Sequence, residues 1–389
     1  MALAGEVLDS TERLGAHVDA WDALAVERGL PFCAPPWMLA WWRHVPGPRA
    51  VLRAVAVRDG DELVAIAPFY ADRRPGRPTR YRLLGASTSH RVEPLVKPGR
   101  EQEAAGAIAS ALAGVEPTAD VIYFESVDAG SRWPARLAEA WPEGRRPLTL
   151  REWSGPAPTA SLDGLTFDTW MKQKSRNFRS QAGRMRRRLE ARGARFAVAS
   201  TEQELERGLA AFARLHYARW QDRGGSVALD ASVERTLAEA GRALLHSGRF
   251  RLVSIEAEGK TISAHIFVAA GGEVSYWNGG FDEEWAADQP SMRALVVAIE
   301  DAFERSDRRL DLGGGVEPYK YRLADDEDLL ETALVVPRRR RYPLVKLQLA
   351  PHRLRHEVAR RLSDETRARV RNELSRLPGI DARSRRKGR

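Results

Sequence analysis

The fold of this chain is decided by residues 251–270, which read RLVSIEAEGKTISAHIFVAA. Apolar and polar residues alternate on both sides of Glu258-Gly259-Lys260, and this pattern predicts two antiparallel strands joined by a tight turn. A strand at Glu273–Asn278, a helix at Ser291–Arg305 and a strand at Arg309–Leu312 are expected to follow. This order of elements indicates an α/β unit.

An earlier part of the chain repeats the pattern. Val51–Arg58 and Glu62–Tyr70 alternate in the same way, and a shift of 199 residues places Gly60 on Gly259. The hairpin is followed in both halves by a strand, a helix and a strand; in the first half these are expected at residues 81–84, 101–112 and 120–126. The shared order predicts that one α/β unit has been duplicated.

Three further segments are predicted after the first copy of the repeat. A strand is expected near Pro147–Trp153, and a linker at Ser154-Gly155-Pro156-Ala157-Pro158, because glycine and proline interrupt regular structure. A helix at Phe167–Arg192 then begins the second unit. The predicted domains are residues 1–158, residues 159–337, and a basic helical tail at residues 338–389.

Composition excludes several classes of protein. The chain has 389 residues, of which 43% are hydrophobic and 30% charged, so it can form two cores and is not disordered throughout. No apolar run approaches the roughly 18 residues of a membrane-spanning helix. A single cysteine, Cys33, excludes an intrachain disulfide and a cysteine-based metal site. We expect a cytoplasmic protein without a metal, which the tail could bring to a membrane surface.

The net charge of +9 is unevenly distributed. Residues 338–389 hold 18 lysines and arginines against 5 acidic residues, whereas residues 1–337 have a net charge of −4. Within that body, Lys172–Arg195 holds ten basic residues and one acidic residue. The total charge therefore does not indicate that the folded domains bind nucleic acid.

Five motifs also occur in an order typical of one group of enzymes. They are Phe32…Pro36-Trp37; Val64-Ala65-Ile66-Ala67-Pro68-Phe69-Tyr70; Ser175-Arg176-Asn177-Phe178-Arg179 with Arg186-Arg187-Arg188-Leu189; Trp220…Arg223-Gly224-Gly225; and Asp311-Leu312-Gly313-Gly314…Tyr319-Lys320. Over about residues 20–337 the chain resembles the CelD/BcsL-like acetyltransferases of the GNAT superfamily, which are related to FemAB-type peptidyl and aminoacyl transferases.

The resemblance implies two tandem GNAT-like domains, each with a mixed, mostly antiparallel sheet flanked by helices, and a substrate cleft near their junction. It implies transfer of an acyl group from acyl-CoA, such as acetyl-CoA, to an amine or hydroxyl. The acceptor would be a small molecule or a sugar-linked precursor of polysaccharide or cell envelope. Two alternatives are aminoacyl transfer from aminoacyl-tRNA, as in the FemAB branch, and a degenerate, non-catalytic binding module.

The stretch expected to bind the CoA pyrophosphate departs from the superfamily pattern. Residues 287–292 read ADQPSM and contain no glycine. Backbone amides at a helix N-terminus can still hold a phosphate, so Gln289 and Ser291 are the candidates there. Gly313 and Gly314 are the other cofactor-binding candidates, although glycines after a strand are as often a flexible turn.

Four residues of the second unit are candidate catalytic groups. His265 replaces the aliphatic Ile66 of the first unit and is either a base or a buried histidine within the sheet. Asp311 ends a strand and is either a base or a group that orients a neighbouring amide. Tyr319 and Lys320 follow the glycines; tyrosine would donate to a leaving thiolate and lysine would neutralise developing charge, unless both lie on the surface.

Further residues are candidates for substrate binding. Arg176 and Arg179 share one helix face and would bind an anion, with Asn177 holding an amide or sugar hydroxyl; the alternative is a solvated basic face. Tyr276 and Asn278 share one face of a strand and would line the cleft, although core packing also suits Tyr276.

The tail adds a last set of predictions. Apolar residues at helical spacing predict a helix over residues 351–377, which packs back on the body or binds tRNA or an anionic membrane surface. The oligomeric state is left open by the sequence.

Overall fold

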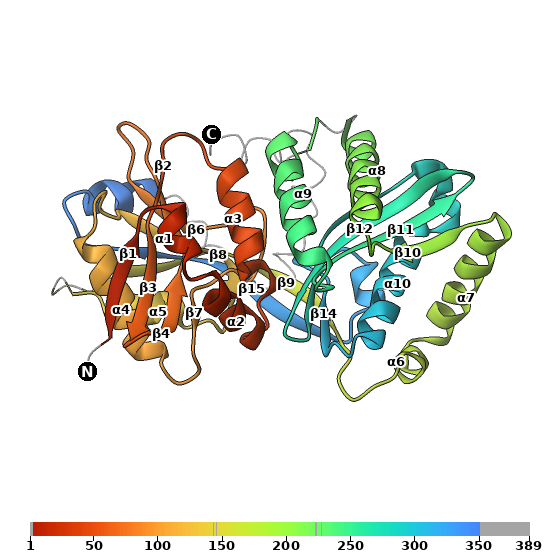
Figure 1. Cartoon of the computed structure of the whole chain (residues 1–389), viewed down its shortest axis with the longest axis horizontal. Coiled ribbons are helices and arrows are strands. Elements are labelled where there is room, and N and C mark those ends of the chain that lie inside the picture. Colours follow the sequence, from red (N-terminus) through yellow and green to blue (C-terminus); the bar gives the residue numbers. More distant parts are fainter. Residues whose placement is uncertain (1–2, 143, 145, 222–223, 227, 351–389) are drawn as a thin grey trace. The chain divides into compact units, whose positions relative to one another are not determined.

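The structure is a computed structural model that describes residues 3–142, 144, 146–221, 224–226 and 228–350 (Figure 1). The chain divides into two units, Met1–Arg338 and Arg339–Arg389. In the second unit, residues 342–350 are helical. The helix expected at residues 351–377 and Arg223 of the fourth motif lie outside the described residues.

The first half of the larger unit contains short strands and five α-helices. Its elements are β1 (Ala4–Leu8), α1 (Thr11–Gly15), α2 (Val18–Glu27), η1 (Pro31–Cys33), α3 (Pro35–His44), β2 (Ala50–Leu52), β3 (Ala54–Asp59), β4 (Glu62–Ala67), β5 (Phe69–Asp72), β6 (Arg80–Leu83), β7 (Leu95–Val96), α4 (Glu101–Gly114), β8 (Val121–Asp128), α5 (Trp133–Glu139) and β9 (Leu148–Ser161).

The second half repeats the hairpin, strand, helix and strand of the first. Its elements are α6 (Phe167–Gln173), α7 (Arg176–Ala191), β10 (Arg195–Val198), α8 (Glu202–Gln221), α9 (Ala231–Leu245), β11 (Phe250–Ala257), β12 (Lys260–Ala270), β13 (Glu273–Phe281), η2 (Glu283–Asp288), α10 (Pro290–Glu304), β14 (Arg309–Asp311), η3 (Lys320–Arg322) and β15 (Asp326–Val336).

The strands form two sheets flanked by helices, an antiparallel one and a larger mixed one. One has four strands in the order β1-β3-β4-β7, and the other has eleven in the order β10-β11-β12-β13-β14-β9-β15-β8-β6-β5-β2. Neighbouring strands are antiparallel except for two pairs, β6–β8 and β13–β14. Each parallel pair is joined through a helix, α4 in the first half and α10 in the second (Figure 1).

The hairpin that decides the fold has the expected alternation. Leu252 and Ile266 belong to a core that also contains residues of α8 and α9, whereas Val253 and Phe267 belong to a core with residues of α7 and α10. Successive side chains of a strand point to opposite faces, so both faces of β11 and β12 are covered by helices. Gly259, at φ +75°, supplies the positive φ of the turn.

The predicted linker at residues 154–158 is wrong, because these residues continue strand β9. Pro156 and Pro158 have no N–H to donate to a neighbouring strand, and for this reason the sequence pattern predicted an irregular segment. Their carbonyl groups accept from Gly315 N (2.9 Å) and Leu312 N (3.0 Å), on the side where β14 has already ended. Since the N–H and C=O of one strand residue face the same side, the missing N–H removes no ladder hydrogen bond.

The two halves exchange strands. β15 of the second half lies between β8 and β9 of the first, and β9 lies between β15 and β14. β9 and β15 pair antiparallel over their whole common length, from Asp326↔Thr159 to Val336↔Leu148. A domain boundary at residue 158, which falls inside β9, stays a prediction.

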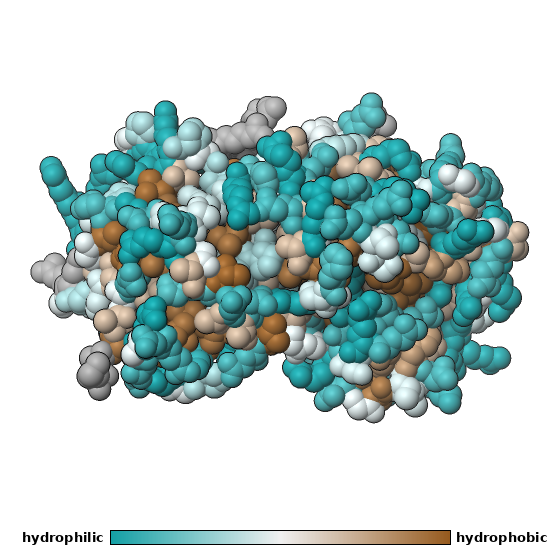
Figure 2. Space-filling model, in the orientation of Figure 1, coloured by the Kyte–Doolittle hydropathy of each residue, from teal (hydrophilic) through white to brown (hydrophobic). Residues whose placement is uncertain are grey.

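Among the described residues, no helix is both long enough and apolar enough to cross a bilayer. The face of the molecule drawn in Figure 2 is dominated by hydrophilic side chains, with hydrophobic ones in separate patches. The predicted helix at residues 167–192 is interrupted at Lys174 and Ser175, and the Ser175 hydroxyl caps α7 by accepting from Phe178 N at 3.2 Å.

Candidate active site

The site begins where two parallel strands part. β13 and β14 pair over three residues only, from Glu273↔Arg309 to Ser275↔Asp311. β13 then continues to Phe281, whereas the chain after β14 turns at Gly313, where φ is +73°. The β12–β13 register also shifts between Ile266 and Phe267, which leaves Trp277 as an extra residue in a β-bulge. The edge of β13 beyond Ser275 is therefore not paired with β14.

Two tyrosines and a histidine lie at this edge. His265 is paired across the strands with Gly279, where a Cβ would stand 2.1 Å from His265 Nδ1, so glycine makes room for the ring. His265 Nδ1 is 3.2 Å from the Tyr276 hydroxyl, and the two rings stack with centroids 5.7 Å apart. The Tyr276 hydroxyl in turn bonds with the Tyr319 hydroxyl. The arrangement joins β12, β13 and the segment before η3.

Burial sets the protonation of these groups. Burial, followed by the charge of Arg219, lowers the pKa of His265 to about 3, so its ring is neutral at neutral pH and a weak base. Burial and the nearby Glu317 raise the pKa of Tyr319 to about 12, so its hydroxyl keeps its proton. Tyr319 is therefore a hydrogen-bond donor over the whole physiological range. A catalytic role for His265 stays a prediction.

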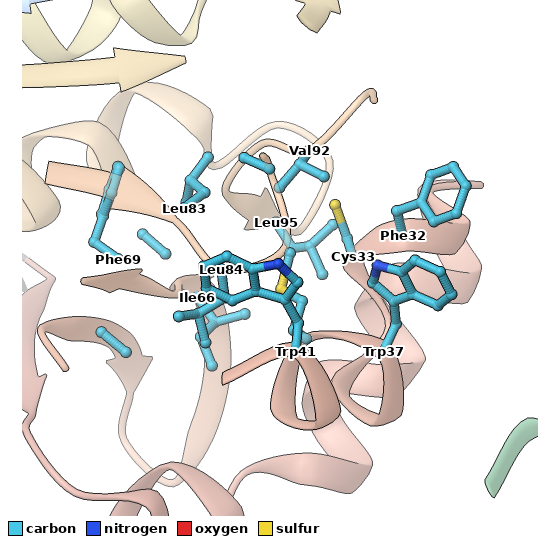
Figure 3. Packing of buried hydrophobic residues seen from close by; sticks show 14 of the residues in the cluster. Phe32, Cys33, Trp37, Trp41, Ile66, Phe69, Leu83, Leu84, Val92 and Leu95 are labelled. Atoms are coloured by element: carbon cyan, nitrogen blue, oxygen red, sulfur yellow. The ribbon is translucent and has the colours of Figure 1, made fainter. Parts of the chain in front are cut away.

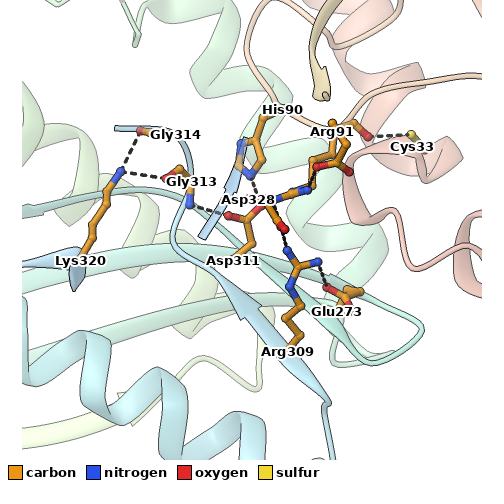
Figure 4. Close-up of polar contacts among 11 residues, drawn as sticks. Cys33, His90, Arg91, Glu273, Arg309, Asp311, Gly313, Gly314, Lys320 and Asp328 are labelled. Atoms are coloured by element: carbon orange, nitrogen blue, oxygen red, sulfur yellow. Dashed lines mark hydrogen bonds and ion pairs between the residues drawn. The ribbon is translucent and has the colours of Figure 1, made fainter. Parts of the chain in front are cut away.

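Asp311 lies at the point where the strands part (Figure 4). Its Oδ1 accepts from Gly313 N at 2.8 Å, while Oδ2 is 2.7 Å from Arg91 Nε and 3.0 Å from His90 Nε2. Burial opposes ionisation of this carboxyl, but His90 and Arg91 outweigh it and hold its pKa well below the usual range. The geometry favours an orienting role for Asp311 over proton acceptance.

Arg91 extends this cluster to other strands. Its guanidinium also pairs with Asp128 at the end of β8 and with Asp328 of β15, the latter at 2.7 Å. Asp328 pairs further with Arg309, which is 3.4 Å from Glu273 (Figure 4). The first half of the chain is thus tied to β14 through buried charges.

Lys320 holds the turn that follows β14. Its ammonium donates to Gly314 O at 2.8 Å and to Gly313 O at 3.2 Å, and lies 3.2 Å from a carboxylate oxygen of Glu317. The side chain is buried. These contacts fix the path of the backbone beside Tyr319, and a direct catalytic role for Lys320 stays a prediction.

The remaining binding candidates lie near the N-terminus of α7. A cavity of about 540 Å³ opens there, lined by Gln173, Lys174, Ser175, Asn177, Phe178, Gln181, Tyr321, Arg322, Ala324 and Asp325. Asn177 is among the lining residues, and its role in substrate binding stays a prediction. Arg176 is exposed on the first turn. Arg179 donates to Lys172 O (2.8 Å) and Lys174 O (2.6 Å), so it holds the connection between α6 and α7.

Gln181 links this cavity to the N-terminus of α10. Its amide Nε2 donates to Gln289 Oε1 at 2.5 Å, and its Oε1 accepts from Arg322. Gln289 is the N-cap of α10 in the left-handed region, at φ +53°, and Ser291 lies half-buried in the first turn. Asn278 is turned to its own backbone, since its Oδ1 accepts from Gly279 N at 2.8 Å.

The predicted residues therefore fall into two groups. His265, Tyr276, Asp311, Gly313 and Tyr319 meet at the parting strands, with Gly314 and Lys320 in the adjoining turn. The residues of α7 and of the α10 N-terminus form the second group. Sequence reasoning missed His90, Arg91, Arg219 and Gln181. For the first two, the available signal was a histidine and an arginine directly after the polar run Ser87-Thr88-Ser89.

A comparison with protein families covers the part of the chain that holds these residues. Residues 176–321 match the family model described as Acetyltransferase (GNAT) domain, and this stretch contains every site residue predicted from the sequence. The chain therefore contains a GNAT-type acetyltransferase domain. The finer assignment to a CelD/BcsL-like group stays a prediction. Comparison with curated protein sequences gives no match.

Solved structures show the same fold over both halves. FemX superposes with a TM-score of 0.62 at 14% identity, covering 88% of this chain and 99% of FemX. The C-terminal domain of a putative lysylphosphatidylglycerol synthetase from Agrobacterium fabrum gives 0.54 at 11% identity, covering 87% and 96%. A conserved protein from Bacteroides thetaiotaomicron gives 0.52 at 11%, covering 85% and 98%. At these identities the likeness is one of fold.

Proposed function

We propose that the chain is an acyltransferase that moves an acetyl or other acyl group from acyl-CoA to an amine or hydroxyl. The observation that carries the proposal is the parting of β13 and β14 inside the matched domain, with the protonated Tyr319 and Tyr276 at the opening. The acceptor class that the CelD/BcsL-like resemblance favours is a small or sugar-linked precursor of polysaccharide or cell envelope.

The donor would lie along the free edge of β13. The unpaired backbone groups beyond Ser275 suit an extended arm that carries amides, as the pantetheine of CoA does. Within the described residues, no side chain caps α10, so the N–H groups of Ser291 and Met292 are open to an anionic group such as a pyrophosphate. The lack of glycine in this loop therefore does not remove the anion site.

Transfer then needs attack, polarisation and departure. The acceptor nitrogen or oxygen forms a bond to the acyl carbon, and the bond from that carbon to sulfur breaks. Tyr319 donates a hydrogen bond to the departing thiolate, and Tyr276 fixes the direction of that hydroxyl. Asn177 at the α7 cavity and the neighbouring exposed Arg176 would hold an anionic or sugar-linked acceptor, with Arg179 keeping the loop in place.

Calorimetric titration tests the donor. We expect binding of acetyl-, malonyl- or long-chain acyl-CoA, and no comparable binding of aminoacyl-tRNA. Tight, salt-sensitive binding of aminoacyl-tRNA through the basic tail would instead favour a FemAB-like transferase. Binding of neither donor would contradict the proposal and leave a non-catalytic module.

A matched pair of tyrosine variants tests the mechanism. Tyr319→Phe removes the donor to the thiolate, so kcat for acetyl transfer should fall by about 100-fold while the Kd for acetyl-CoA changes little. Tyr217→Phe is the control: this exposed tyrosine of α8 bonds with Glu234 of α9, and its removal should leave kcat unchanged. Equal kcat in the two variants would remove Tyr319 from the mechanism.

A further inference from the structure

A loop of the first half reaches the parting strands of the second. The loop follows β6 and carries His90. Hydrogen bonds from both halves of the chain hold the residues on either side of this histidine. The Thr88 carbonyl accepts from Trp277 Nε1 at 2.8 Å, and the Ser89 hydroxyl accepts from Trp37 Nε1 at 2.9 Å. On the other side, Arg91 N donates to Ser126 O at 2.7 Å. His90 is therefore held in place by its neighbours in the loop.

The ring of His90 lies beside an ionised carboxylate. Its Nε2 is 3.0 Å from Asp311 Oδ2, and the Phe32 ring meets it edge-on with centroids 5.0 Å apart. A carboxylate beside one ring nitrogen favours the tautomer with hydrogen on that nitrogen. The other nitrogen, Nδ1, then carries a free lone pair. A carboxylate at this distance also stabilises the positive charge that follows proton uptake.

The same ring stands at the opening between β13 and β14. Gly313 has no side chain, and a Cβ there would lie 3.7 Å from His90 Cε1 and 3.4 Å from Tyr276 O. The glycine thus leaves room for a methyl-sized group between the imidazole and the Tyr276 carbonyl of β13. The His90 side chain is 14% exposed, whereas that of His265 is fully enclosed and a weak base. Of the two histidines, His90 is the one that a ligand can reach.

We propose that His90 is the general base of the acyl transfer and that the first half of the chain completes the active site in this way. The proposal rests on the proposed acyltransferase function. His90 Nδ1 takes the proton of the acceptor amine or hydroxyl as its nitrogen or oxygen bonds to the acyl carbon. The electron pair of the broken carbon–sulfur bond leaves with the thiolate, which receives a hydrogen bond from Tyr319. The imidazolium stays paired with Asp311 until it returns its proton to solvent.

The first experiment needs no acceptor. Long-range proton–nitrogen spectra of the whole protein, with the His90 signals assigned by comparison with His90→Gln, report the tautomer. We expect the Nε2–H form in the free protein and a shift of the Nδ1 signal when acetyl-CoA is added. The Nδ1–H form, or a His90 signal that bound acetyl-CoA leaves unmoved, would overturn the proposal.

The second experiment measures turnover with acetyl-CoA and glucosamine, which offers both an amine and hydroxyls; hydrolysis by water, which needs the same base, is followed in parallel. His90→Ala should lower kcat by at least about 100-fold with an unchanged Kd for acetyl-CoA. Added imidazole should restore part of the rate to this variant, which a purely structural loss would not allow. His246→Ala, at the exposed end of α9, is the control and should behave as wild type.

The outcomes separate the two proposals. Acetyl-CoA that is bound and consumed equally by wild type and His90→Ala would overturn the role of His90 and leave the acyltransferase function standing. A loss of rate that imidazole does not restore, together with weaker acetyl-CoA binding, would also overturn it. Acetyl-CoA that wild type neither binds nor consumes would overturn the proposed function itself.

Discussion

The two halves of the molecule contain the same parallel strand pair with opposite surroundings. In the first half, β6 and β8 pair at Arg80↔Val121 and Tyr81↔Ile122. Leu83, the last residue of β6, and Leu84 after it are buried with Ile66, Trp41 and Phe69 in an apolar cluster (Figure 3). In the second half, the corresponding region holds Tyr276, Tyr319, His265 and Asp311. One opening is packed as a core, and the other is kept polar.

This difference indicates that the two copies of the duplicated fold have different roles. Apolar packing excludes ligand from the first opening and contributes stability. The second opening keeps buried polar groups, each of which needs a partner to offset its desolvation. Two of those partners, Arg91 and His90, come from the first half, and both contact Asp311. The first unit therefore supports the second instead of duplicating its chemistry.

The largest expected effect comes from cutting the charge contact between the halves. Arg91→Met leaves the buried Asp311 with His90 as its remaining partner and removes the partner of Asp128, whereas Asp328 keeps its pair with Arg309. Breaking a buried ion pair on one side costs about 3–5 kcal/mol. Urea denaturation should show a loss of that size in the free energy of unfolding.

A surface pair provides the control for that measurement. Arg58→Met breaks the pair of Arg58 and Asp61, whose charged atoms are 3.8 Å apart and exposed. Its cost should be about 1 kcal/mol or less. Equal losses in the two variants would mean that the halves do not depend on Arg91.

A smaller effect is expected from making the first opening resemble the second. Ile66→His places an imidazole in the apolar cluster of the first half, at the position equivalent to His265. A buried polar group without a hydrogen bond costs about 1–3 kcal/mol. The free energy of unfolding should fall by that amount beyond the loss measured for Ile66→Val, which keeps the site apolar. A value no larger than that of Ile66→Val would break the contrast between the openings.

The smallest effect is a change in how stability depends on pH. The pKa of His265 is about 3 when folded and near 6.5 when unfolded. Between these values the unfolded chain binds one more proton, so the free energy of unfolding falls as the pH is lowered, by up to about 1.4 kcal/mol per pH unit. His265→Ile introduces the isoleucine found at the equivalent position of the first half. This variant should lose the His265 contribution to the slope between pH 6 and pH 4.5. His246→Ala should retain it, and equal slopes in all three proteins would contradict a buried neutral His265.

Much of the fold could be predicted because its signals are local. Alternation around Gly60 and Gly259 located both hairpins, and period 3.6 located α4, α8, α9 and α10. The failures have local causes as well. Pro156 and Pro158 suggested a linker, although their missing N–H groups face a side without a partner strand. Pro68 separates β4 from β5, which enter different sheets, whereas the sequence predicted one strand.

The site was predictable only in its C-terminal part. Asp311, Tyr319 and Tyr276 lie at strand ends or next to glycines, where sequence patterns are informative. Arg91 and Asp311 are 220 residues apart, and a contact between distant loops leaves no period or spacing in the sequence. His90 belongs to the same loop and was missed for the same reason.

The strand exchange between the halves has a consequence for synthesis of the protein. A nascent chain that has reached Ser161 exposes β8 and β9 without β15, the strand that lies between them. Their open edges can pair with other chains until Val336 has left the ribosome. The larger sheet therefore closes only after β15 has emerged, and the first half must wait for the second before it reaches its native form.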